Sequence, residues 1–112
     1  APQLPWLWTE RGSEETTVLF VKGQLQDKDL IIVSPPDDAV VWYYSELYGI
    51  KNSQFDSRIA FDRALVLVDP AEDQTPASVI ADRGPDQAVL DVESARLLGE
   101  FGKLQVYDVS CE

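Results

Sequence analysis

The chain has 112 residues, 45% of them hydrophobic and 26% charged, as expected for one folded domain with a single hydrophobic core. Its formal net charge of -11 opposes binding to a phosphate backbone, so we expect no nucleic-acid partner. The absence of histidine excludes Ser-His and Cys-His catalysis, and the single cysteine, Cys111, forms no internal disulfide and cannot hold zinc alone.

Residues 1–12 are predicted to form an extended apolar arm or linker, because Pro2 and Pro5 disfavour a helix. Residues 13–112 are predicted to form a single α/β domain. No apolar run reaches the roughly 18 residues that a membrane span needs. The start at Ala1 without methionine predicts a processed product or a piece of a longer protein.

The first half of the domain is predicted to contain two helices around one strand. Ser13 is a suitable N-cap for a helix over residues 14–26, which buries Val18 and Val21. Residues 30–34 are continuously aliphatic, as in a strand buried on both faces. A second helix then ends before Gly49. Its predicted buried side carries Val40, Tyr43, Tyr44 and Leu47, flanked by Val41 and Tyr48. Its predicted exposed side carries Trp42, Ser45 and Glu46.

The second half begins with a loop, in which residues 58–61 are compatible with a short strand. Residues 64–69 form a second buried strand, and Thr75 with Pro76 begins a helix that Gly84 ends. The pattern favours a last helix over residues 92–102 and a strand at the sheet edge over 104–109. We therefore expect a small, mostly parallel sheet of three or four strands flanked by helices, a Rossmann-like layered α/β fold.

Acidic residues follow both buried strands. Parallel strands present their carboxyl ends at one edge of the sheet, where ligands bind. The residues expected at this rim are Asp37, Asp38, Asp69, Glu72 and Asp73. Carboxylates suit a hard cation such as Mg²⁺ or Ca²⁺. Helix capping is the favoured interpretation, by Asp37 or Asp38 for one helix and by Asp73 or Thr75 for the next, so we assign no metal and no cofactor.

A phosphoacceptor site of the receiver type is the third interpretation of these acids. It requires an acidic pair after the first strand and a lysine after a late strand. Lys103 precedes the last strand, which argues against this chemistry. Neither strand-to-helix loop contains glycine, so phosphate binding of the Rossmann or P-loop type is unsupported.

Tryptophans are the candidate interface residues. Trp42 falls on the predicted polar side of its helix, and exposed tryptophan is enriched at protein interfaces. Trp6 and Trp8 in the arm are candidates for the same role, and beside a membrane they suit the interfacial aromatic belt. The sequence therefore predicts an interface that includes Trp6, Trp8 and Trp42.

Three stretches together resemble one family. The first, "LQDKDLIIVSPPDDAVVWYYSELYGI", contains a strand, a Ser-Pro-Pro turn and a helix with a Tyr-Tyr pair. The second, "RALVLVDPAEDQTPASVIADRG", contains a strand, a Gln-Thr pair and a short helix that ends in glycine. The third, "LLGEFGKLQVYDVS", contains the closing strand with a tyrosine near its end. The chain from about residue 18 onward resembles the C-terminal soluble region of bacterial polytopic GT-C-type glycosyltransferases, similar to dolichyl-phosphate-mannose–protein mannosyltransferases.

The resemblance implies a domain that follows the last transmembrane helix, on the extracytoplasmic face of the bacterial membrane. The family's catalytic acid lies between early transmembrane helices, so the resemblance assigns no catalytic residue to this chain. The implied partners are the transmembrane portion of the same polypeptide and the acceptor substrate, and the parent enzyme would use a polyprenyl-phosphate sugar donor. The alternative is a stand-alone acidic α/β module that binds a ligand or cation.

Overall fold

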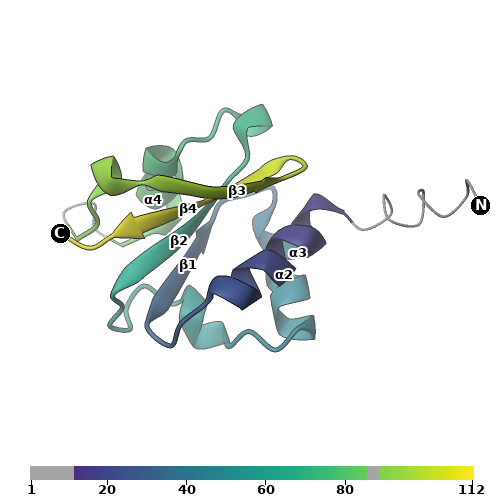
Figure 1. Ribbon diagram of the computed structural model, residues 1–112, viewed down its shortest axis with the longest axis horizontal. Helices are drawn as coiled ribbons and strands as arrows, with labels where there is room; N and C mark the ends of the chain where they lie inside the picture. Colours follow the sequence, from purple (N-terminus) through teal and green to yellow (C-terminus); the bar gives the residue numbers. More distant parts are fainter. Residues whose placement is uncertain (1–11, 86–88) are drawn as a thin grey trace, which may run out of the picture.

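The computed structural model describes residues 12–85 and 89–112. These residues form an α/β domain in which a four-stranded mixed sheet lies between helices (Figure 1). The helices are α2 (Ser13–Gln24), α3 (Asp38–Leu47) and α4 (Pro76–Arg83). The strands are β1 (Asp29–Val33), β2 (Arg63–Val68), β3 (Arg96–Phe101) and β4 (Leu104–Ser110).

The strands lie in the order β1-β2-β4-β3. β1 and β2 are parallel, whereas β4 is antiparallel to both β2 and β3. The α/β class was predicted correctly, but the expectation of a mostly parallel, Rossmann-like sheet was wrong. A tight hairpin joins β3 to β4, and such a connection leaves no crossover helix to make the two strands parallel.

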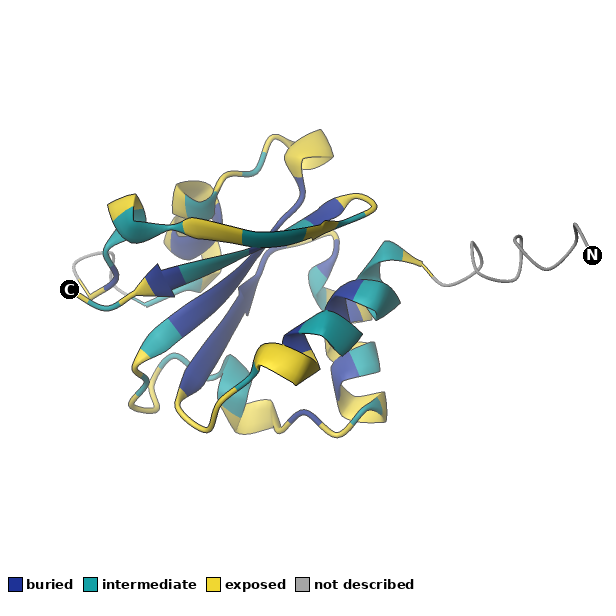
Figure 2. Ribbon diagram, in the orientation of Figure 1, coloured by how far each residue is buried: buried dark blue, intermediate teal, exposed yellow. Residues whose placement is uncertain are grey.

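Each face of the sheet carries its own apolar core. On one face, Ile31, Val33 and Leu65 pack with Val18 and Val41 of α2 and α3. On the other face, the alternate strand residues pack against Val79 and Ile80 of α4: Leu30, Ile32, Ala64 and Val66. β1 and β2 are therefore dark blue along nearly their whole length in Figure 2. This two-sided burial explains their unbroken aliphatic sequences.

The predicted last helix over residues 92–102 is wrong. Residues Val92–Ser94 form one 3₁₀ turn, and the rest of the segment is β3. The register of β3 shifts between Leu97 and Gly99. A bulge of this kind inserts one residue, so Leu98 and Phe101 both reach the same core although they are three residues apart. The helix was inferred from the spacing of Val92, Ala95 and Leu98, but these residues lie in the 3₁₀ turn, the residue after it and β3.

Two further expectations for strands were also wrong. β4 is not at the edge of the sheet, because it lies between β2 and β3. Residues 58–61 form turns and irregular backbone rather than a strand. Asp56 accepts hydrogen bonds from Arg58 there, and a side chain that closes such a local turn competes with strand pairing.

The β3–β4 turn packs closely on the start of α2. Gly102 has φ 64°, and a Cβ atom at this position would lie 2.1 Å from Ser13 Oγ. Ser13 was expected to cap α2, but Gly12 occupies the N-cap position and Ser13 Oγ accepts a hydrogen bond from the Lys103 amide at 3.1 Å. The hairpin and α2 are thereby joined at one end of the molecule.

Gly102→Ala is expected to lower the free energy of unfolding by about 1–2 kcal/mol from the left-handed backbone alone, with a further loss from the contact with Ser13. Urea unfolding measures the change. Gly23→Ala is the matched control, because a Cβ at this helical position meets nothing within 4 Å. A loss at Gly102 no greater than that at Gly23 would contradict the assignment.

Candidate functional site

The loops after β1 and β2 meet, as the sequence predicted. Gln74 joins them, because its Nε2 donates to the carbonyl of Pro35 at 3.0 Å and its Oε1 accepts from the Asp69 amide at 3.0 Å. Asp37 and Asp69 are 1% and 2% exposed. Two of the predicted rim carboxylates are therefore neighbours inside the domain rather than on its surface.

Lys103 completes this group of charges. Its Nζ lies 2.9 Å from Asp37 Oδ1 and 2.8 Å from Glu14 Oε2. The argument that Lys103 stands at the wrong end of its strand was wrong, because β4 is antiparallel and its amino end lies beside the carboxyl ends of β1 and β2. We call Glu14, Asp37, Asp69 and Lys103 the Lys103 cluster.

Burial and charge act in opposite directions on Asp37. Burial raises the pKa of its carboxyl group, the Lys103 ammonium opposes that rise, and the neighbouring Asp69 adds to it. Asp37 occupies the N-cap position of α3, yet its side chain makes no capping hydrogen bond. The Lys103 cluster contains two aspartates and a lysine, the residue types that a phosphoacceptor site of the receiver type requires. Its two aspartates are too deeply buried, however, for a phosphodonor to reach them.

A pH dependence follows from the raised pKa of Asp37. The folded chain holds this proton more tightly than the unfolded chain, whose carboxyl titrates near 3.8. The contribution of Asp37 to stability is therefore full below that value and is lost as pH rises through the folded-state pKa. We expect Asp37→Asn to gain stability relative to the native chain as pH rises from about 4 to 7. Urea unfolding across this range measures the difference, and parallel curves would contradict it.

Asp38, Glu72 and Asp73 lie outside the Lys103 cluster, and Asp69 also makes a local hydrogen bond. Asp38 accepts from the Ala39 amide at 2.9 Å and lies 3.3 Å from Arg83 of α4. Asp69 accepts from the Ala71 amide at 3.1 Å, whereas Glu72 and Asp73 are exposed. Of the predicted helix caps, Thr75 is confirmed, because it forms a capping box with Ser78, whereas the Asp37 side chain makes no capping hydrogen bond. The described residues contain no group of three acidic, histidine or cysteine side chains placed to hold a metal ion.

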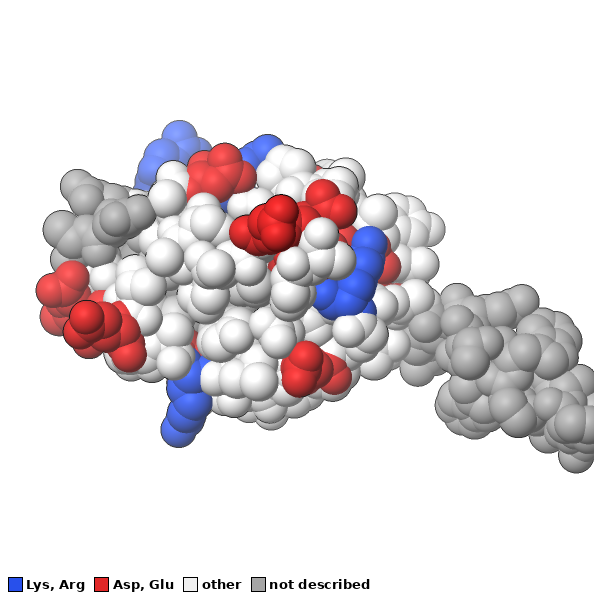
Figure 3. Space-filling view, turned by 90° about the horizontal axis from the view of Figure 1, so that it is seen from above, with Lys and Arg blue, Asp and Glu red and all other residues white. Residues whose placement is uncertain are grey.

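Acidic side chains do not gather in one patch on the face of the domain seen in Figure 3. On the face seen in Figure 3, acidic side chains stand in separate groups among uncharged residues, with lysine and arginine side chains in between. Such a distribution provides solubility rather than one focused cation site.

α3 turns a different face to the core than the sequence suggested. Val41 and Ser45 are buried, and the Tyr48 hydroxyl donates to Glu15 of α2. Of the four residues predicted to be buried, Tyr44 packs against the core, but the other three form an exposed apolar stripe: Val40 at 40%, Tyr43 at 59% and Leu47 at 60%. Ser45, predicted to be exposed, is buried. The helix is apolar on both sides, so periodicity alone could not decide which side packs on α2.

Trp42 is 45% exposed, as predicted. It stands beside a groove of about 320 Å³ whose lining also includes Ile32 of β1, Phe55 and Arg83. Trp6 and Trp8, the other predicted interface residues, lie outside the described residues. None of the helices in the described part of the chain has the length and apolar composition of a membrane span.

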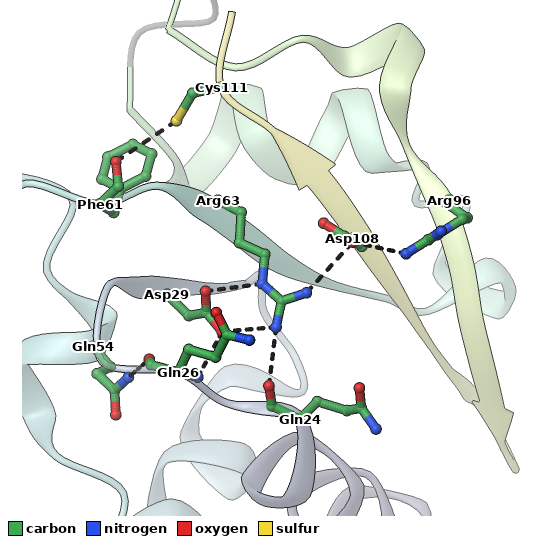
Figure 4. Close-up of polar contacts among 9 residues, drawn as sticks. All are labelled: Gln24, Gln26, Asp29, Gln54, Phe61, Arg63, Arg96, Asp108 and Cys111. Carbon is green, nitrogen blue, oxygen red and sulfur yellow. Dashed lines mark hydrogen bonds and ion pairs between the residues drawn. The ribbon is translucent and has the colours of Figure 1, made fainter.

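A second ionic group was not anticipated from the sequence. Arg63 donates through Nε and Nη2 to both carboxylate oxygens of Asp29, at 2.8 and 2.9 Å, and to the carbonyl of Gln24 at 2.9 Å (Figure 4). Its Nη1 lies 3.4 Å from Asp108, which also pairs with Arg96. We call these residues the Arg63 network. The signal in the sequence was a charged residue next to each aliphatic run, and in the structure it is the first residue of the strand.

The cysteine is a partly buried thiol. Cys111 Sγ lies 3.7 Å from the carbonyl oxygen of Phe61 (Figure 4), and burial raises the pKa of the thiol, with a smaller contribution from Asp62. We expect Cys111 to react more slowly with iodoacetamide at pH 8 than free cysteine does, because less thiolate is present. Mass spectrometry of the native chain measures the rate, and the urea-unfolded chain is the control. Equal rates in the two states would contradict the assignment.

No family model, curated protein or solved structure matches this chain.

Proposed function

We propose that this chain is a non-catalytic extracytoplasmic domain of a polytopic bacterial glycosyltransferase that uses a polyprenyl-phosphate sugar donor. The proposal rests first on the three stretches that resemble the C-terminal region of such enzymes. It is supported by the burial of Asp37 and Asp69 and by the absence of histidine, because neither carboxylate is open to a substrate. In this view the chain contributes binding surface, and catalysis takes place in the transmembrane portion.

The observation that carries the proposal is the apolar stripe on α3. Val40, Tyr43 and Leu47 stand at positions i, i+3 and i+7, so they share one side of the helix. An exposed apolar patch on a folded domain marks an interaction surface. The partner that we propose for this stripe is the transmembrane portion of the same polypeptide, against which the domain packs near the acceptor substrate.

The proposal is tested in two steps. The coding sequence upstream of Ala1 is expected to encode several membrane spans, and their absence would refute the proposal. The transmembrane portion and this chain are then expressed as separate polypeptides and purified together in detergent. Tyr43→Glu with Leu47→Glu is expected to reduce recovery of the complex by about tenfold or more, because interface contacts of this type dominate binding energy.

Ile59→Glu is the matched control, since Ile59 is 48% exposed and lies outside α3. Recovery that falls equally with Ile59→Glu would mean that added negative charge, rather than the stripe, weakens the complex. Recovery that is unchanged by the two α3 substitutions would refute the stripe as the interface.

The alternative of a stand-alone cation-binding module has less support. Asp37 already faces an ammonium group, and Asp38 pairs with Arg83. Calorimetric titration with Ca²⁺ and Mg²⁺ is therefore expected to show no heat at metal concentrations on the order of 1 mM. A saturable heat that is abolished by Asp69→Asn would favour the alternative instead.

A further inference from the structure

The groove beside Trp42 has the size of a small-molecule site. Its volume is about 320 Å³, and such sites usually measure about 300–1,000 Å³. Its accessible lining includes Trp42, which is 45% exposed, together with Ala39 and Phe55. The residues of β1 that line it are almost fully buried. The chemistry of the groove therefore depends on the side chains around β1 and not on β1 itself.

Two charged side chains, Asp38 of α3 and Arg83 of α4, line the same groove. Asp38 Oδ2 lies 3.3 Å from Arg83 Nη2, and Asp38 Oδ1 accepts from the Ala39 amide at 2.9 Å. Arg83 Nε in turn lies 3.6 Å from Asp82 Oδ2. The side chains of Asp38 and Arg83 are 28% and 49% exposed, so a molecule in the groove can reach both.

These ion pairs determine which charge the groove accepts. An anion would meet two carboxylates, Asp38 and Asp82, beside one guanidinium, in a chain whose net charge is -11. A cation would compete with Arg83 for Asp38 and would be repelled by the guanidinium. A molecule without charge avoids both costs. The ion pairs therefore favour an uncharged ligand.

The hydrogen-bonding groups of the groove narrow the class further. A carboxylate accepts through several lone pairs and a guanidinium donates through several N–H groups, so the contacts given above occupy only part of their capacity. A hydroxyl group both donates and accepts, so two adjacent hydroxyls can donate to Asp38 and accept from Arg83 together. Trp42 adds an apolar aromatic surface to the same groove. A sugar ring combines adjacent hydroxyls with an apolar face of C–H groups.

We propose that the groove beside Trp42 binds an uncharged sugar ring. The apolar face of the ring lies on the indole of Trp42, and adjacent hydroxyls of the ring hydrogen-bond with Asp38 and Arg83. Val40, Tyr43 and Leu47 do not line the groove. The sugar site therefore does not depend on the proposed docking of the apolar stripe, and either assignment can fail without the other.

The test uses the 112-residue chain, labelled with ¹⁵N, and the methyl glycosides of glucose, galactose, mannose and N-acetylglucosamine as probes. Two-dimensional NMR is expected to show saturable shifts of the Trp42 indole N–H and the Ala39 amide with one or more probes. The Kd should be on the order of 1 mM, because a single ring has few atoms in contact.

Variants of the groove identify the groups that bind the sugar. Trp42→Ala is expected to weaken binding by about tenfold or more, and Trp42→Phe, which keeps an aromatic face, should retain part of the affinity. Arg83→Met keeps most of the side-chain length but removes the donors, so it should also weaken binding. Val40→Ala, on the same helix but outside the groove, is the matched control and should bind as the native chain does.

Three further probes separate the possible outcomes. Methyl glucuronide and methyl glucosaminide keep the ring but carry a negative and a positive charge, and both are expected to bind more weakly than methyl glucoside. Tighter binding of either charged probe would overturn the assignment of an uncharged ligand. Adenosine that binds more tightly than every glycoside would overturn the assignment of a sugar. Absence of saturable shifts with all four glycosides up to about 50 mM would overturn the site itself.

Discussion

Replacing Arg63 with leucine is expected to lower the free energy of unfolding by about 3–5 kcal/mol, the largest effect of any single substitution considered for this chain. Asp29 is 4% exposed, and Arg63 supplies two hydrogen bonds to its carboxylate. Leucine would leave that carboxylate buried without its cation. The carbonyl of Gln24 at the end of α2 would lose a donor in the same step.

Urea unfolding of the native and variant chains measures this loss. Asp29→Asn combined with Arg63→Leu is expected to recover part of it, because an amide costs less to bury than an unpaired carboxylate. Arg58→Leu is the matched control: Arg58 also pairs with an aspartate, but its side chain is 89% exposed, so its loss should leave stability within experimental error. A loss at Arg63 no larger than at Arg58 would contradict a structural role for the Arg63 network.

Lys103→Met is expected to have the second largest effect, a loss of about 2–3 kcal/mol. Lys103 is the cation that faces the buried Asp37, and it also contacts Glu14 of α2. Methionine preserves most of the side-chain length but leaves Asp37 beside Asp69 without a neutralising charge. The expected loss is smaller than at Arg63, because Lys103 is 43% exposed and water compensates part of it.

The pH dependence of this loss distinguishes a charge effect from a packing effect. Without Lys103 the pKa of Asp37 rises further, because the cation that opposes the effect of burial is gone. The destabilisation is then largest near pH 7 and shrinks as acid protonates Asp37. Lys51→Met, at an exposed position, is the control and should show neither effect. A loss that is equal at pH 4 and pH 7 would mean that packing, not charge, is responsible.

Elements with a single compatible interpretation were predicted correctly from the sequence. The continuous aliphatic runs of β1 and β2 predict strands buried on both faces, because a strand open to water on one face alternates. Thr75, Pro76 and Gly84 bound α4 through local capping chemistry, which depends on nearby residues alone. Gly49, with φ 84°, follows the end of α3 as predicted for the same reason.

Segments with two compatible interpretations were predicted wrongly. Leu98 and Phe101 share a face through a β-bulge, and their spacing alone is equally compatible with a helix. α3 is apolar on both sides, so only its packing on α2 shows that Val41 is buried and Leu47 is exposed. In both cases the decisive contact joins residues distant in sequence, and local pattern contains no information about it.

The candidate sites divide in the same way. The sequence by itself determined the composition of the rim after β1 and β2, the meeting of its two loops and the exposure of Trp42. Only the tertiary structure decided that Lys103 belongs to this rim, that Asp37 and Asp69 are buried in it and that β1 is the terminal strand of the sheet. The physical reason is the place and direction of one strand. β4 lies antiparallel beside β2, so Lys103, which directly precedes β4, reaches the buried carboxylate of Asp37. Because β4 occupies the other side of β2, β1 remains at the margin of the sheet.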